Sequence, residues 1–363
     1  MDPDSRRRHE AFWRREAMDR PLFGINIGFF VQQRFPRVLA SVPQGVIGPD
    51  DIPVDLFLDD CDDLYESHRD LGDYPFVAAP FVGIPWMEAI AGCPIVASPA
   101  NFWAERCVGD LSTWQAPPNL RDNPWTQKLL DLLQALVRHS RGRYGVAPTL
   151  MRGPLDILSA LLGAAELPLA FIDQPAAVAR ALEGCAAIWA ETARLQLAGI
   201  PESRQGYVAG DAALRCWAPE RLLWLQEDAM SLISPRLYGQ HVLPIDRKLS
   251  EMFPCVVYHL HGSALWAIDD LVRLPEVRVI ELNLEAAACD LEGTWAGWKK
   301  IQQHKPVILW RTYGDDFLPW LERVHREFSP IGLSVQVSTN NLAEAQKVKA
   351  GFFNHEDHQD RDL

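Results

Sequence analysis

Two histidines, one residue apart, end the apolar run in the segment CVVYHLHGS. Alternate side chains of a β-strand share a face, so His259 and His261 should point the same way at the carboxyl end of a strand. The next apolar run, 277–284, repeats this design with Glu281 and Asn283 at its end. If the two runs are neighbouring strands, two imidazoles and a carboxylate converge.

Two imidazoles and one carboxylate are ligands that suit Zn²⁺, Fe²⁺ or Mn²⁺. We therefore predict a divalent-metal site formed by His259, His261 and Glu281, with an open position for water or substrate, and we expect Asn283 to contact the substrate. An alternative stays open, because either imidazole could instead hydrogen-bond a substrate or a backbone carbonyl.

Other segments place polar side chains just after expected strands. Arg152 in MRGPLD and Arg311 in WRTYGDD have the bidentate geometry that suits a substrate carboxylate, although Arg152 could equally pair with a nearby aspartate. Tyr313 suits proton transfer. Trp86, in the loop of PFVGIPWMEAIAGCPI, is expected either on a pocket wall or in an ordinary strand-to-helix connection.

The elements that must position these residues alternate between short apolar runs and longer amphipathic segments, a pattern typical of parallel βα units. We predict an α/β fold, a (β/α)8 TIM barrel in one domain over residues 1–348 with an N-terminal extension. Residues 349–363 are expected to be a disordered tail. A ninth strand could lie within 224–234. The eight expected strands are 22–29, 76–81, 144–150, 205–210, 255–262, 277–284, 306–311 and 333–339.

Composition limits the partners. The chain has 363 residues, a net charge of -13 and a pI near 5.2, which argues against nucleic acid and anionic membrane surfaces. The seven cysteines include no CxxC pair, and neither an export signal nor an 18-residue apolar stretch is present. These features predict a cytoplasmic enzyme with a small-molecule substrate.

Several segments, in order, resemble the uroporphyrinogen decarboxylase superfamily, over about residues 8 to 348. They are RHEAFWRREAMDRPLFG, RGPLDILSALLGAAELPLAFIDQPAAVARAL, LQEDAMSLISPRLYGQHVLP, YHLHGS and GLSVQVSTNNLAEAQ. That superfamily includes cobamide-dependent methyltransferases and is similar to cobalamin-independent methionine synthase. The resemblance implies a (β/α)8 barrel with its site at the carboxyl ends of the strands, a substrate-facing Asp228, and often a homodimer.

The methyltransferase branch implies methyl transfer or demethylation, with a corrinoid protein as methyl donor or acceptor. Its members resemble this chain in carrying H-x-C where His259-Leu260-His261 stands, and an acidic residue where Glu281 falls. A last cysteine is expected after a glycine near the end of the barrel, where Leu333 follows Gly332. The pattern that remains is closer to a 2-His-1-carboxylate set than to a thiolate site. Cys289 is a substitute ligand by position, or else a packed small hydrophobe.

The decarboxylase branch gives an alternative function, a metal-free lyase whose carboxylated substrate is held by Arg34, Arg152 or Arg311. In place of the arginine-rich signature of the true decarboxylases, this chain has FVQQRFPRV, which contains Arg34. A second alternative is a non-catalytic binding protein on the same barrel.

Overall fold

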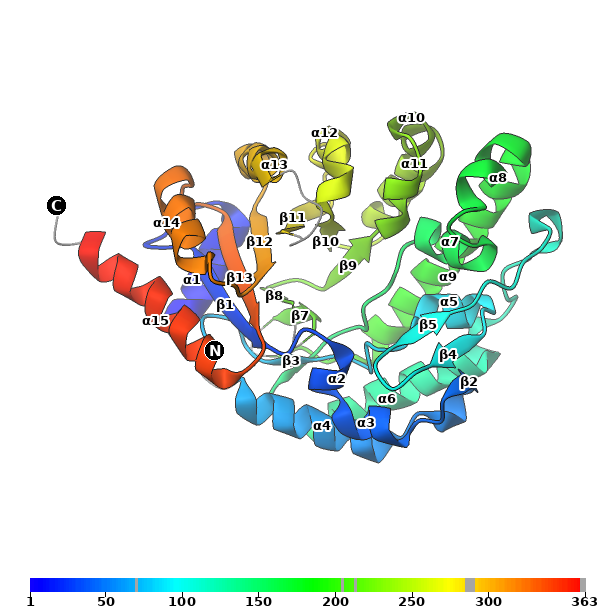
Figure 1. Ribbon diagram of the computed structural model, residues 1–363, viewed down its shortest axis with the longest axis horizontal. Helices are drawn as coiled ribbons and strands as arrows, with labels where there is room; N and C mark the ends of the chain where they lie inside the picture. Colours follow the sequence, from blue (N-terminus) through cyan, green and yellow to red (C-terminus); the bar gives the residue numbers. More distant parts are fainter. Residues whose placement is uncertain (69–70, 204–205, 212–213, 285–290, 360–363) are drawn as a thin grey trace.

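The computed structural model describes residues 1–68, 71–203, 206–211, 214–284 and 291–359. Its largest sheet has six parallel strands in the order β1-β13-β12-β11-β10-β9. These strands are β1 (Leu22–Ile27), β9 (Leu222–Gln226), β10 (Cys255–Leu260), β11 (Val277–Leu284), β12 (Val307–Thr312) and β13 (Leu333–Thr339). Figure 1 shows the strands at the centre of the molecule and helices around them.

The connections between strands are mostly helical. The longer helices are α1 (Pro3–Arg14), α4 (Val54–Ser67), α6 (Pro124–Ser140), α7 (Pro154–Leu162), α9 (Pro175–Gly199), α11 (Leu243–Glu251), α13 (Leu291–His304), α14 (Phe317–Glu327) and α15 (Leu342–Gln359). Shorter ones are α2 (Val31–Arg34), α3 (Pro36–Ser41), α5 (Trp86–Ala91), α8 (Leu167–Asp173), α10 (Pro235–Leu237), α12 (Ile268–Leu271), η4 (Asp228–Leu232), η5 (Tyr238–Val242) and η6 (Gly262–Ala267).

Small sheets complete the β-structure. β3 (Val77–Ala78) and β6 (Gly145–Val146) form a parallel pair, so two expected strands are present but short. β2 (Gly45–Ile47), β4 (Ile95–Ala97) and β5 (Phe102–Ala104) form an antiparallel sheet. The six-stranded parallel sheet agrees with the predicted α/β class.

The expected strand at 205–210 lies elsewhere than predicted. β7 (Tyr207–Gly210) pairs antiparallel with β8 (Arg215–Ala218) and is outside the six-stranded sheet. The position beside β10 is taken by β9, from the segment considered for a ninth strand. Gly210, the last residue of β7, has a φ of +88° and lies against the Leu214 carbonyl. Glycine permits this close approach, and the chain then returns as β8 beside β7.

The six strands separate two apolar clusters. Leu223, Leu225, Val256 and Tyr258 face outward and pack with the helices in the larger cluster. Leu222, Trp224, Val257, Val279 and Ile308 face inward and form a separate cluster. This two-residue alternation means that residues continuing the inward set toward the carboxyl ends of the strands point into the same central space.

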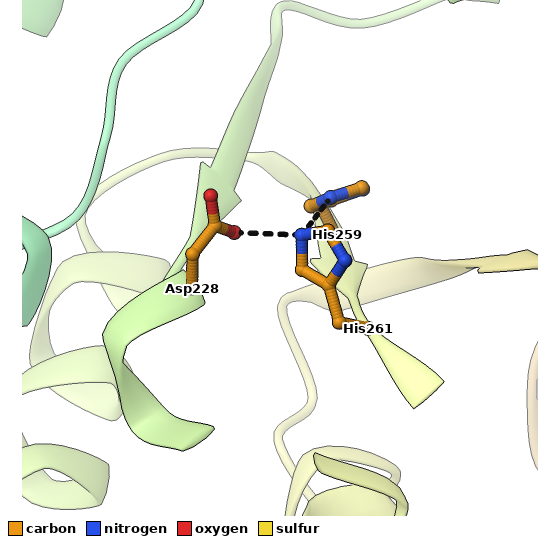
Figure 2. A group of neighbouring side chains, drawn as sticks. All are labelled: Asp228, His259 and His261. Atoms are coloured by element: carbon orange, nitrogen blue, oxygen red, sulfur yellow. Dashed lines mark hydrogen bonds and ion pairs between the residues drawn. The ribbon is translucent and has the colours of Figure 1, made fainter. Parts of the chain in front are cut away.

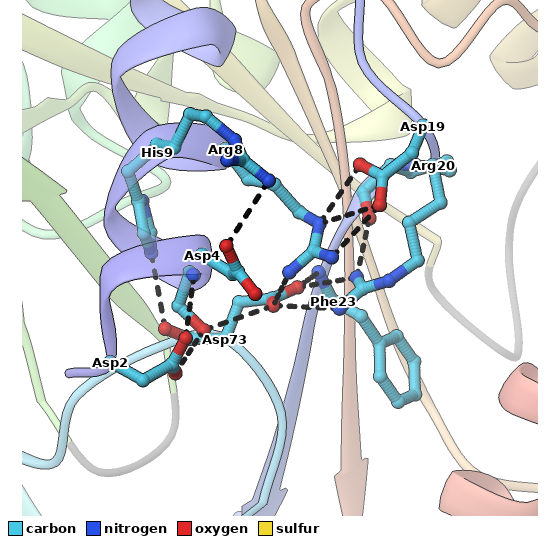
Figure 3. Close-up of polar contacts among 11 residues, drawn as sticks. Asp2, Asp4, Arg8, His9, Asp19, Arg20, Phe23 and Asp73 are labelled. Carbon is cyan, nitrogen blue, oxygen red and sulfur yellow. Dashed lines mark hydrogen bonds and ion pairs between the residues drawn. The ribbon is translucent and has the colours of Figure 1, made fainter.

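Helix α1 covers the inner cluster at the amino ends of the strands. Phe12 belongs to the inner cluster, and the Trp13 indole donates to the Trp217 carbonyl at 2.6 Å. The buried Asp73 carboxylate joins α1 to the start of β1, as Figure 3 shows. It accepts hydrogen bonds from Arg20 at 2.6 and 2.8 Å, from the Phe23 amide at 2.9 Å and from the Ser5 hydroxyl at 3.3 Å.

Helix α15 continues to Gln359. Residues 360–363, and Cys289, lie outside the described residues. Within the described ranges, a single helix long and apolar enough to cross a membrane is not found, whereas α7 and α8 meet those criteria as a pair bent by 94°.

Candidate functional site

The carboxyl ends of β9 and β10 bring three polar side chains together. His259 is on β10 and His261 follows it by two residues, so both continue the inward face. Asp228 follows the last residue of β9, the inward-facing Gln226, by two residues and begins η4. Figure 2 shows the Asp228 carboxylate and the two imidazoles close together, with dashed lines that join His261 to Asp228 and to His259.

The ligand-type atoms of this group are close. His259 Nε2 and His261 Nε2 are 3.0 Å apart, and His261 Nε2 is 3.1 Å from Asp228 Oδ1. One atom from each of the three residues lies within 4.8 Å of the other two. The side chains are partly exposed, at 29% for Asp228, 13% for His259 and 24% for His261, so the group is open to a ligand.

Glu281 lies next to His259 but outside the group formed by Asp228, His259 and His261. The two residues are register partners on β10 and β11, and the fully buried Glu281 carboxylate accepts a hydrogen bond from His259 Nδ1. Burial acts to lower the pKa of His259. The charge and the hydrogen bond of Glu281 act to raise it by more, so the pKa lies above its usual value. Of the predicted ligand set, Glu281 is thus the partner of a histidine, and Asp228 is the carboxylate that faces both imidazoles.

Asp228 is held from two sides. Gln226 Nε2 donates to its Oδ2 at 3.0 Å, and Arg152 Nη2 lies 3.5 Å from the same oxygen. Burial acts to raise the pKa of Asp228, but the His261 hydrogen bond and the nearby positive charges bring it below the usual value. Arg152 also pairs with the buried Glu88 at 3.2 Å, so its guanidinium links two carboxylates.

Buried carboxyl groups lie beneath the site. Glu227 points away from Asp228 and accepts from the Leu155 amide at 2.9 Å, at the first turn of α7. Gly153 permits this approach, because a Cβ there would overlap the Gln226 carbonyl and the Glu227 carboxyl. Burial raises the pKa of Asp156 to about 7, with the charge of Asp228 adding to it. These groups fix the end of β9 to α7.

Two cavities border Asp228. The first, of about 250 Å³, contains His259, His261, Gln226 and Asn283 at one end, and its walls are mainly apolar. The apolar wall residues are Phe29, Leu150, Leu214, Trp224 and Trp310, and the paired Arg34 and Asp211 also line the cavity. The second, of about 560 Å³, is lined by Arg152, Asp156, Trp103 and Arg106 as well as Asp228. Small ligands can therefore reach the same carboxylate from two directions.

The other predicted site residues divide into two groups. Arg34 and Asn283 line the first cavity, and Arg152 lines the second. Trp86 is instead a core residue, 1% exposed, whose indole donates to the Phe81 carbonyl. This burial fits the second of the two places expected for Trp86, an ordinary strand-to-helix connection, because α5 turns the side chain into the helical layer.

Arg311 and Tyr313 also lie away from the first cavity. Arg311 follows Trp310, which faces inward, so the alternation of β12 sends its guanidinium outward to Asp316 at 2.6 Å and over the Trp320 ring. The Tyr313 ring lies tilted against the Phe317 ring, with the ring centroids 5.7 Å apart. Neither residue is placed to bind or protonate a ligand beside the histidines.

Leu333 is at the wrong end of its strand to replace a metal ligand. It is the first residue of β13 and pairs with Val307, the first residue of β12. His259, His261 and Asp228 lie at the opposite, carboxyl ends of the parallel strands. A cysteine at position 333 would therefore be far from these side chains, so Leu333 gives no evidence of a lost ligand.

Sequence reasoning missed several cavity residues, although a signal existed. The inward set of β9 reads Leu222, Trp224, Gln226 and then Asp228, which is a strict two-residue alternation. The same alternation in β12 leads to Trp310. Asp211 accepts a hydrogen bond from the Leu214 amide and also pairs with Arg34.

The donor set fits a divalent cation. With His259 neutral and its Nδ1–H donated to Glu281, its Nε2 is an acceptor, and the Asp228 oxygen is another. His261 Nε2 carries at most one hydrogen, so it cannot donate a separate hydrogen to His259 Nε2 and to the Asp228 oxygen. A cation would satisfy all three atoms together, and nitrogen and oxygen donors of this kind suit Zn²⁺, Fe²⁺ or Mn²⁺.

Comparisons with known proteins give a fold likeness. No protein-family model and no curated protein matches the chain. Among solved structures, a methyltransferase from Methanosarcina mazei superposes with a TM-score of 0.66 at 11% sequence identity, over 96% of this chain and 98% of that one. The chain therefore has, over nearly its whole length, a fold similar to that of a methanogen methyltransferase.

Proposed function

We propose that this chain is a metal-dependent enzyme that transfers a methyl group to or from a small molecule. The observation that carries the proposal is the convergence of Asp228, His259 and His261 on one point at the edge of a mainly apolar cavity. The fold likeness to a methyltransferase supports the reaction class, and the resemblance to the uroporphyrinogen decarboxylase superfamily points the same way.

Asp228, His259 and His261 would hold the metal. When bound, a divalent metal supplies a Lewis acid that orients a substrate heteroatom and favours its deprotonated form. The metal is Zn²⁺, or Fe²⁺ or Mn²⁺ in view of the two-histidine, one-carboxylate donor set. Glu281 would not be one of the metal ligands. Its role is to hold the proton on His259 Nδ1, which leaves Nε2 free to bind.

The protein's other groups orient and enclose the reactants. Gln226 and Arg152 hold the second oxygen of the Asp228 carboxylate, which directs the first oxygen at the histidines. The His261 hydrogen bond, with the charges of the histidines and Arg152, keeps the pKa of Asp228 below its usual value. Phe29, Trp224 and Trp310 would exclude water from the body of the substrate. A corrinoid protein is proposed as methyl donor or acceptor.

We also propose that the six-stranded sheet is the larger part of a (β/α)8 barrel. β3 and β6 would supply the two remaining strands, since they are parallel to one another. Arg152, after β6, forms a parallel bridge with Gln226 of β9, and this bridge supports closure at the β9 edge. At the β1 edge, Gly24 forms an antiparallel bridge with Gly72, before β3, which brings the chain near β1 without the parallel pairing of a barrel strand.

The metal content of the untagged protein tests the proposal. We expect about one equivalent of a divalent metal by elemental analysis, and less than about 0.1 equivalent in the His259→Ala/His261→Ala double variant. The matched control is the His304→Ala variant, which removes an exposed histidine at the end of α13 and should keep its metal. Metal-free wild-type protein, or full occupancy in the double variant, would contradict the metal site.

The reaction class needs its own assay. Protein supplied with the divalent metal is incubated with a methylated corrinoid and a panel of thiols, alcohols and amines. Demethylation of the corrinoid is followed by the change in its absorbance. The metal-free lyase is a separate outcome, namely carbon dioxide release that survives chelation. It has weaker support, because Arg34, Arg152 and Arg311 each already contact a carboxylate of the protein. Absence of any turnover would leave the binding-protein alternative.

A further inference from the structure

Two thiols lie together at the base of the β4–β5 hairpin. Cys93 follows Gly92, which ends α5, and Cys107 follows β5. The strands between them pair in antiparallel register, with the Glu105 amide donating to the Pro94 carbonyl at 2.8 Å. This pairing holds the two ends of the hairpin side by side and places the Cys93 and Cys107 sulfur atoms 3.9 Å apart.

The two sulfur atoms differ in access. Cys93 is 3% exposed and belongs to the main apolar cluster. Cys107 is exposed and lines an open cavity of about 490 Å³ together with Arg106, Glu166 and Asp173. In the described part of the chain, the other cysteines, Cys61, Cys185, Cys216 and Cys255, are buried. A reagent from solvent therefore meets Cys107 first, and Cys93 stands behind it.

We propose that Cys93 and Cys107 form a dithiol site that reacts with low-molecular-weight disulfides to give an internal disulfide. The Cys107 thiolate attacks one sulfur of the reagent, forms a mixed disulfide and expels one thiolate. Cys93 then loses its proton, and its sulfur attacks the Cys107 sulfur and expels the second thiolate. The reagent gains two electrons and the two protons that the cysteines lose, and the protein gains one sulfur–sulfur bond.

The site is connected to the metal-ligand group through α5. The Cys93 amide donates to the Glu88 carbonyl at 2.9 Å, and the Glu88 side chain pairs with Arg152, which lies 3.5 Å from Asp228. On the other side, the Cys107 amide donates to the Leu161 carbonyl of α7. Formation of the disulfide draws these two anchored ends closer, since bonded sulfurs are about 2.05 Å apart.

The reaction should be slow at neutral pH. Burial raises the pKa of Cys93, and burial also raises that of Cys107 although the hydrogen bond between the thiols opposes this. Because the thiolate is the attacking form, the rate of exchange should increase as the pH is raised from about 7 to about 9.

Mass spectrometry of the full-length chain tests the proposal. Reduced protein is incubated with oxidised glutathione, quenched with acid and N-ethylmaleimide, and analysed intact and after trypsin. We expect a loss of two hydrogen masses and a disulfide between the peptides that end at Arg106 and begin at Cys107, which trypsin otherwise separates. Cys93→Ser should instead retain one glutathione on Cys107, and Cys107→Ser should form neither product.

The control is Cys255→Ser, which removes a buried thiol on β10 and should leave the Cys93–Cys107 product unchanged. A wild-type protein that keeps glutathione on Cys107, that links Cys107 to a different cysteine, or that does not react at pH 9 would overturn the proposal. These results do not depend on metal binding or methyl transfer, so they separate this site from the proposed function.

Discussion

The Glu281 carboxylate on β11 lies directly across from His259 on β10 and accepts the hydrogen bond of its Nδ1. This contact fixes which ring nitrogen of His259 carries a proton, and therefore which one can bind a cation. Glu281→Gln should lower metal affinity by about 10- to 100-fold, as expected for a residue that orients a ligand. Competition with a chromophoric chelator measures the affinity.

The matched control for Glu281→Gln is Glu251→Gln at the exposed end of α11, which should leave the affinity unchanged. If Glu281→Gln binds metal as tightly as the unmodified protein, then Glu281 does not orient His259 for this purpose.

His68 should make folding stability depend on pH. Its Nδ1 donates to the Leu64 carbonyl at 2.7 Å and its Nε2 accepts from the Ile27 amide at 2.8 Å, so the ring must be neutral. Burial lowers its pKa to about 3, with the charge of Arg215 adding to the effect. The folded pKa is below the unfolded value, so this contribution is complete above about pH 6.5 and is lost as the pH falls.

Between pH 7 and pH 5 the loss from His68 should be about 2 kcal/mol in the free energy of unfolding. Denaturant unfolding at several pH values measures it. His68→Gln, whose amide can make both hydrogen bonds, should remove this part of the pH dependence, whereas His304→Gln on the surface should retain it. Equal slopes for His68→Gln and wild type would refute the assignment.

Asp73 should be essential for the attachment of α1. It is 3% exposed and contacts Arg20, whose side chain is 11% exposed, so Asp73→Ala leaves a nearly buried cation without its carboxylate. We expect a loss of about 3 to 5 kcal/mol in the free energy of unfolding. Asp19→Ala removes a partner of Arg8 that is 61% exposed and should cost at most about 1 kcal/mol. Urea unfolding of both variants gives the comparison, and similar losses would contradict it.

Gly153 should tolerate no side chain. Gly153→Ala would press a methyl group against the Gln226 carbonyl and the Glu227 carboxyl, at the end of the strand that carries Asp228. We expect a destabilisation of about 1 to 3 kcal/mol and weaker metal binding. Gly239→Ala, in η5 with open space around its α-carbon, should be neutral or slightly stabilising. Thermal unfolding with and without added metal distinguishes the two, and an unchanged Gly153→Ala protein would argue against this packing.

The sequence contained enough to place His259 and His261. Both follow the apolar alternation of β10, and the alternation holds in the structure because one face of the strand packs on helices and the other on the inner cluster. It also gave the face of Glu281. It could not give the register between β10 and β11, which puts Glu281 level with His259 and in a hydrogen bond with its Nδ1.

The errors have related causes. Arg311 was expected near a ligand because it ends a strand, but strand ends have two faces, and Trp310 occupies the inner one. Leu333 was compared with a ligand position by its preceding glycine, whereas only the bounds of β13 show that it begins the strand. Strand 205–210 has the composition of a sheet strand, but it pairs antiparallel with β8, the strand that follows it in the chain, and composition does not distinguish this local hairpin from a place in the parallel sheet.

Asp228 borders both the aromatic-walled cavity and the larger cleft beside Arg152. A donor and an acceptor could then approach Asp228 from separate cavities, of which the first also contains His259 and His261. The first product would then not have to leave before the second reactant arrives. Double-reciprocal plots of rate against one substrate, at several concentrations of the other, should therefore show intersecting lines instead of parallel ones.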